Sequence, residues 1–135
     1  MTLIEAENAI IEENVILGMQ YHPDCGITKI GDNAFVHCYS LEKITIPPTV
    51  SHIGAGAFDD TVWMKNFEGD FVCVNGILIS YRGSDVHAEI PDGVTAIGEM
   101  AFSLTSISEV TIPSSVTSIE YGAFMRCYDL NEINL

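Results

Sequence analysis

The feature that most constrains this 135-residue chain is a short frame that returns at nearly constant spacing. An Ala-Phe pair occurs four times, and successive pairs stand 23, 44 and 22 residues apart. Because 44 is twice 22, the long interval predicts two periods, one of which has been rewritten. A repeat of roughly 20–50 residues is typical of solenoids and related arrays. The pairs are Ala34-Phe35, Ala57-Phe58, Ala101-Phe102 and Ala123-Phe124.

A longer pattern surrounds each pair. Ile-Pro-x-x-Val-x-x-Ile-Gly-x-x-Ala-Phe starts at Ile46, at Ile90 and at Ile112, where Glu120 replaces the glycine. A partial copy starts at Ile27. Matching at so many positions at one period is a far more specific signal than a lone short motif.

Local periodicity predicts the structure of each repeat. Apolar and polar residues alternate over 41–46, 110–112 and 133–135, as in half-buried strands. The following proline lacks an N–H group, so it ends the strand and begins a turn. Ile30, Ala34, Cys38 and Leu41 then step by four, four and three, the spacing of one helical face. We therefore expect a strand, a proline turn, a second short extended piece and about two turns of helix.

One repeat of this size cannot cover its own apolar faces. Stacked repeats can, because each strand bonds to its neighbours and each apolar face packs against the next repeat. The sequence therefore predicts a β-dominated α/β repeat solenoid. Its parallel strands should form one continuous sheet on one face, with short helical turns on the other.

The frame L-x-x-I-x-I-P-x-x-V-x-x-I-G-x-x-A-F-x-x-C resembles the BspA-like leucine-rich repeat over residues 27–135. The rewritten segment, about 62–83, is similar to a β-hairpin variant found between regular repeats of that family. Asn75-Gly76, between two apolar runs, is itself a signal for a two-residue hairpin turn. We expect the whole chain to be one domain, in which residues 1–26 form an irregular N-terminal cap or a degenerate repeat.

The charge balance narrows the choice of partners. The chain has 5 Lys and Arg against 19 Asp and Glu, a formal net charge of −14. Phosphate backbones and anionic membranes are bound through clustered basic residues, so we expect no nucleic-acid partner and no membrane surface. Hydrophobic residues make up 47% of the chain, enough for a folded core. No stretch is apolar for long enough to predict membrane insertion, and no signal peptide is visible at the N-terminus.

The residue three places after each phenylalanine forms a ladder of small side chains, Cys38, Thr61, Thr105 and Cys127. We expect the two cysteines to be separate buried thiols, because they stand several repeats apart. Cys25 and Cys73 lie off this ladder. His22-x-x-Cys25 with His37-Cys38 could suggest a zinc site, but turn and surface residues are the simpler interpretation.

We predict no catalytic residue, no metal site and no cofactor, and therefore no enzyme. No phosphate loop, nucleophile elbow or calcium loop occurs in the chain. The histidines His37, His52 and His87 fall at variable positions of the frame, where solvent exposure is expected.

The outward positions of the predicted strand sheet are the candidate protein-binding face. They are either an ordinary solvated sheet face or a recognition surface, since a solenoid can vary such positions without disturbing its core. Their acidic half favours a neutral or basic protein partner. These residues are Lys43, Thr45, His87, Glu89, Glu109, Thr111, Glu132 and Asn134.

The functional expectation is a non-catalytic protein-interaction module. The family resemblance implies a bacterial cell-surface or secreted protein with an adhesion-type role. Two alternatives remain open: a structural repeat segment of a larger cell-wall protein, and a cytosolic regulatory binding module. The chain closes on Ile133-Asn134-Leu135, a strand without a cap, which predicts either end-to-end self-association or a fragment of a longer array.

Overall fold

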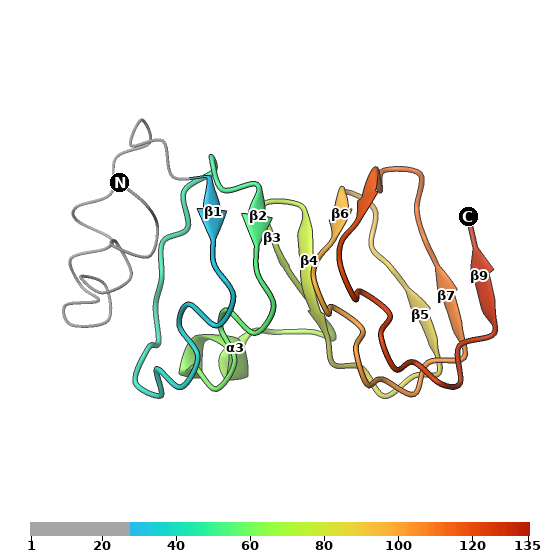
Figure 1. The fold of residues 1–135 in the computed structure, drawn as a ribbon, viewed down its shortest axis with the longest axis horizontal. Helices are drawn as coiled ribbons and strands as arrows, with labels where there is room; N and C mark the ends of the chain where they lie inside the picture. The colour runs from blue at the N-terminus through green and yellow to red at the C-terminus, as the bar shows by residue number, and fades with distance from the viewer. Residues whose placement is uncertain (1–27) are drawn as a thin grey trace. The chain divides into compact units, whose positions relative to one another are not determined.

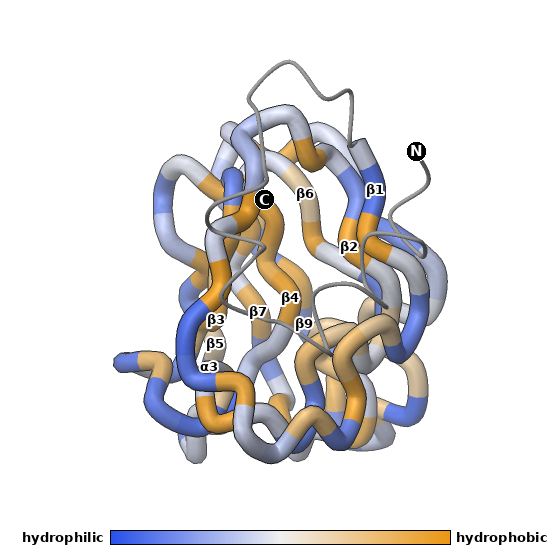
Figure 2. The backbone as a smooth tube through the Cα atoms, turned by 90° about the vertical axis from the view of Figure 1, so that its left-hand side faces the viewer, coloured by the Kyte–Doolittle hydropathy of each residue, from blue (hydrophilic) through white to orange (hydrophobic). Residues whose placement is uncertain are grey.

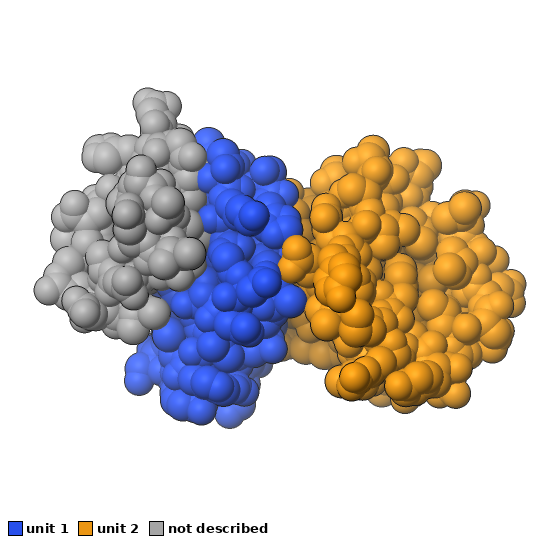
Figure 3. Space-filling model, viewed as in Figure 1, with its two compact units in different colours: residues 1–67 blue, residues 68–135 orange. Residues whose placement is uncertain are grey.

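The computed structural model describes residues 28–135 and divides the chain into two compact units (Figure 3). Unit 1 comprises residues 1–67 and unit 2 residues 68–135. The expectation for residues 1–26 lies outside the described residues, and the expectation of a single domain stays a prediction.

The described part of unit 1, residues 28–67, contains two short strands and one helix (Figure 1). β1 (Lys29–Ile30) pairs in parallel with β2 (His52–Ile53), one repeat later in the chain. α3 (Val62–Asn66) begins after Thr61, whose side chain accepts a hydrogen bond from the Met64 N–H at 3.0 Å. This is the usual way for a threonine to cap a helix.

Unit 2 contains two sheets (Figure 1). One has the strand order β3-β4-β6-β8 and the other the order β5-β7-β9. Apart from the antiparallel pair β3-β4, all neighbours are parallel and come from successive repeats. The strands are β3 (Phe71–Val74), β4 (Ile77–Tyr81), β5 (His87–Glu89), β6 (Ala96–Ile97), β7 (Glu109–Thr111), β8 (Ser118–Ile119) and β9 (Glu132–Asn134).

The predicted hairpin is confirmed. β3 and β4 are joined by Asn75 and Gly76, whose φ angles are 53° and 78°. Two consecutive residues with positive φ are typical of a type I′ turn, whose twist matches that of the flanking strands. A register irregularity between Val72 and Cys73 interrupts the pairing of the two strands.

The β-dominated repeat solenoid is confirmed, but three of its details differ from the prediction. Residues 41–46 form no strand, because the segment one period later contains the helix α3. The Trp63 N–H bonds to the Leu41 carbonyl at 2.8 Å. The prediction of one continuous sheet was also wrong. The second extended pieces pair with one another and not with the first strands, giving the sheet β1-β2 in unit 1 and the strands β6 and β8 of a sheet in unit 2. The first strands form the separate sheet β5-β7-β9, so residues 28–135 contain three sheets.

The predicted two turns of helix in each repeat were also wrong. Residues 31–38 form successive hydrogen-bonded turns, in which the N–H groups of Ala34, Val36 and Cys38 bond three residues back. Asn33 and His37 have φ angles of 56° and 62°, which a right-handed helix does not allow. The N–H groups of residues 33, 35 and 37 bond instead to carbonyls of the next repeat, at 2.7–3.1 Å.

Unit 2 repeats this turn structure. Met100 and Leu104 have φ angles of 58° and 64°, and the N–H groups of Met100, Phe102 and Leu104 bond to the repeat that follows. An interrupted turn leaves alternate N–H groups free to bond between repeats. This explains why the 3.6-residue apolar spacing did not give an α-helix.

Most of the repeated apolar positions of the frame lie in the core, whereas Ile119 in the last repeat is exposed. In unit 2 the cluster includes Leu78, Ile97, Phe102 and Val110, all fully buried. Figure 2 shows hydrophobic residues gathered along β4 and β6. Aromatic rings stack between repeats as well: Phe35 on Phe58 in unit 1 and Phe102 on Phe124 in unit 2, with centroids 5.3 and 5.0 Å apart.

Replacing Leu104 by glycine should stabilise the fold. Leu104 has a φ of 64° and is 68% exposed, so glycine removes backbone strain and loses little packing. The expected gain is about 1 kcal/mol in the free energy of unfolding, measured by urea denaturation. The matched control is Ser106→Gly, at an exposed position without positive φ, which should lose about 0.5 kcal/mol. A loss of stability in Leu104→Gly would contradict this account of the turns.

Candidate functional site

Six of the eight predicted face residues lie together on the sheet β5-β7-β9. In register, His87 stands opposite Glu109 and Glu109 opposite Glu132. The residues between these rows, Ala88 and Val110, are buried, so the two rows belong to the outward face of the sheet. The second row consists of Glu89, Thr111 and Asn134.

Glu109 is the centre of a polar network on this face. Its Oε1 accepts a hydrogen bond from Asn134 Nδ2 at 2.6 Å and lies 3.6 Å from His87 Nε2. His87 Nε2 also contacts Thr111 Oγ1 at 2.9 Å. The side chains of His87 and Glu109 are 37% and 32% exposed, so both remain within reach of a partner. The network therefore orders polar groups from all three strands.

The other two face residues belong to unit 1. Lys43 and Thr45 are exposed in unit 1, on the segment 41–46 that forms no strand. They have no register with β5, β7 or β9, because that register exists only between paired strands.

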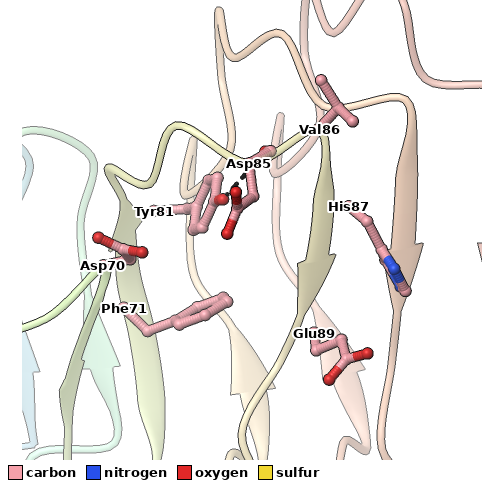
Figure 4. Close-up of a pocket in the computed structure, with 7 residues that line it drawn as sticks. All are labelled: Asp70, Phe71, Tyr81, Asp85, Val86, His87 and Glu89. Carbon is pink, nitrogen blue, oxygen red and sulfur yellow. Dashed lines mark hydrogen bonds between the residues drawn. The ribbon is translucent and has the colours of Figure 1, made fainter.

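A hollow of about 430 Å³ opens beside β5, on the side of the β3–β4 hairpin (Figure 4). Figure 4 shows Asp85 and Val86 at its top and Phe71 and Glu89 lower down. It is lined by Asp70, Phe71, Tyr81, Asp85, Val86, His87 and Glu89. Sequence reasoning found only His87 and Glu89 of this set, because the hairpin residues fall outside the repeat frame.

Tyr81 takes the place of the missing phenylalanine in the rewritten repeat. Its N–H bonds to the Ala101 carbonyl at 2.8 Å, the same bond that Phe102 makes to Ala123. Its ring lies between those of Phe71 and Phe102, with centroids 4.9 and 5.2 Å away. The spacing could have indicated this, since Tyr81 follows Phe58 by 23 residues, close to one period.

Burial raises the pKa of the Tyr81 phenol above its ordinary value, and the negative charges of Asp85 and Asp70 raise it further. The phenol also donates a hydrogen bond to the Asp85 carbonyl at 3.1 Å. The hollow therefore has a negative electrostatic potential and an aromatic wall.

The cysteine ladder is present, but its thiols are only half-buried, which corrects the prediction of buried ones. Cys38, Cys73 and Cys127 are all half-buried thiols outside any disulfide. Cys127 Sγ donates to the Phe102 carbonyl at 3.0 Å and lies 3.5 Å from Thr105 Oγ1, as expected for neighbours on the ladder. Thr61 is buried, and its hydroxyl is satisfied by donating to the Phe58 carbonyl at 2.7 Å.

The zinc alternative gains no support from the described part of the chain. His37 Nδ1 lies 2.8 Å from Asp60 Oδ2, and residues 28–135 contain no group of three side chains placed to hold a metal. His22 and Cys25 lie outside the described residues. Over the same range, no helix has the length and apolar character needed to cross a bilayer.

Comparison with known families decides the classification. The model of the "BspA type Leucine rich repeat region" matches six copies, over residues 11–71 and 82–135. The chain belongs to this family. The gap between the matched segments, residues 72–81, coincides with the β3–β4 hairpin, so the BspA-type repeat is interrupted where the sequence was rewritten.

One solved structure with detectable similarity is a leucine rich cell surface protein from Faecalibacterium prausnitzii A2-165. The identity is 26% and the TM-score 0.47. The match covers 82% of this chain and 40% of the other, so the present chain spans about two fifths of that protein. No curated protein matches this chain.

Ionisation of Tyr81 should require a higher pH than is usual for a phenol. Its pKa is raised in the folded protein, so the stabilisation it contributes is complete below the ordinary value of 10.0 and is lost as the pH rises through the folded-state pKa. The difference between ultraviolet titrations of the wild type and Tyr81→Phe isolates this group. A Tyr81 transition below pH 10 would contradict the site described above.

Proposed function

We propose that this BspA-type repeat chain is a non-catalytic protein-interaction module that binds a basic or neutral protein through the outer face of β5, β7 and β9. The observation that carries the proposal is the in-register row of His87, Glu109 and Glu132, with Glu89 beside it. Paired strands from successive repeats hold these groups about 4.8 Å apart, which makes a regular acidic surface.

Charge complementarity supports this choice of partner. The chain has a net charge of −14, and unit 2 holds only two of its basic residues, Arg82 and Arg126. A surface of this sign attracts basic partners and repels nucleic acid. The network around Glu109 adds order, because it limits the freedom that side chains lose on binding.

Membership of the family supports a place at the cell surface. Both earlier alternatives, a structural segment of a larger cell-wall protein and a cytosolic regulatory module, would use the same repeat stack. A structural segment needs no ligand on the face β5-β7-β9. A binding measurement on this face therefore separates that alternative from the present proposal.

Charge reversal of Glu89, Glu109 and Glu132 together should abolish binding of a basic partner. A lysine- and arginine-rich peptide serves as the test ligand, with affinity measured by calorimetry at low salt. Because three attractive charges become repulsive, we expect at least about a hundredfold loss. Substitution of the same residues by glutamine should give a smaller loss and keep the fold.

The matched control reverses Glu68, Asp92 and Asp129, three exposed acidic residues of unit 2 that lie off this face. It changes the net charge by the same amount. If the control weakens binding as much as the face variant, the peptide responds to overall charge and the proposed face is wrong.

A further inference from the structure

The hollow beside β5 has an aromatic wall held in place by the core. Phe71 from β3 and Tyr81 from β4 have ring centroids 4.9 Å apart, and Tyr81 packs on the fully buried Phe102. Phe71 is only half-buried, and Figure 4 shows its ring directed toward β5. The wall is therefore rigid and still open to a ligand.

Carboxylates surround this wall. Asp70 precedes β3, Asp85 lies in the loop after β4, and Glu89 lies at the end of β5; all three side chains are exposed. Arg82 lies nearby, with its Nε donating to the Gly69 carbonyl at 3.2 Å. His87 Nε2 is engaged on the other side, with Thr111 on β7. The acidic groups lining the hollow thus outnumber the basic ones beside it.

The arrangement suits an organic cation better than a metal ion. No three metal-ligating side chains within residues 28–135 come close enough to hold a metal. Carboxylates spread around a space of about 430 Å³ can instead surround a larger charged group. Aromatic faces attract such a group through the cation–π interaction.

We propose that this hollow binds one arginine side chain of a basic protein partner. A guanidinium is planar and stacks on aromatic rings, while its fork of N–H groups bonds to carboxylates; an ammonium offers only a point charge. This inference rests on the proposed function and locates its anchor. Glu89 belongs to both the hollow and the outer face, so an arginine held here would place the rest of the partner along β5, β7 and β9.

The test is an NMR titration of the whole chain with three short peptides. They are acetylated and amidated Gly-Arg-Gly, the same peptide with lysine, and the same peptide with citrulline, which has the shape of arginine without its charge. The arginine peptide should shift the amide signals of residues 70–71, 81 and 85–89 in a saturable way. We expect about tenfold weaker binding for citrulline and several-fold weaker binding for lysine.

Variants separate the parts of the hollow. Asp70→Asn with Asp85→Asn removes two charges at constant shape, and Phe71→Leu removes the outer ring and spares the buried Tyr81. Each should weaken the arginine peptide several-fold without loss of the folded spectrum. Asp92→Asn with Glu68→Gln is the matched control and should leave the affinity unchanged, since neither residue lines the hollow.

The outcomes separate this inference from the proposed function. Equal binding of the arginine and citrulline peptides, or of arginine and lysine, overturns the arginine site. Shifts confined to β7 and β9 also overturn it, yet they leave the acidic face standing. If neither the short peptides nor the basic peptide used above binds at all, both proposals fail.

Discussion

The structure depends on one backbone interaction that is repeated between neighbouring turns. The N–H of the phenylalanine in one repeat bonds to the alanine carbonyl of the next, as Phe35 does to Ala57 and Phe102 to Ala123 at 2.7 and 2.8 Å. This bond needs a chain that turns without completing a helix, and residues with positive φ two places after each phenylalanine provide it. The aromatic rings then stack in register, because their backbones are already spaced by hydrogen bonds.

The rewritten repeat keeps that bond while it changes everything around it. Tyr81 donates to Ala101 as a phenylalanine would, yet it stands at the end of a hairpin strand and not in a turn. The repeat stack of unit 2 therefore continues from the hairpin without a break in its aromatic row. The hairpin changes the local shape of the stack. Asp70 and Phe71 lie beside β5, and the space between these residues and β5 is the hollow that we propose as an arginine site.

The acidic surface follows from the same regularity. Residues at one position of the frame come to lie side by side, so the row His87, Glu109 and Glu132 concentrates charge that is scattered in the sequence. The hydrogen bond from Asn134 to Glu109 and the contact between His87 and Thr111 hold the side chains of this row in place. They also reduce the repulsion between its carboxylates. A repeat fold thus turns a modest acid excess in each repeat into one continuous acidic surface, which we propose as the binding face.

The sequence alone determined the period, the buried apolar positions, the Asn75-Gly76 hairpin and six of the eight outward residues, because these depend on local spacing and on alternation along a strand. It predicted helix at 31–38, since an apolar step of four is shared by helices and by stacked turns. It predicted a strand at 41–46, since alternation says nothing of whether a partner strand exists. Only the tertiary structure decided where backbone N–H groups find acceptors in the next repeat. For the same reason it alone brought Asp70, Phe71 and Tyr81 together beside β5.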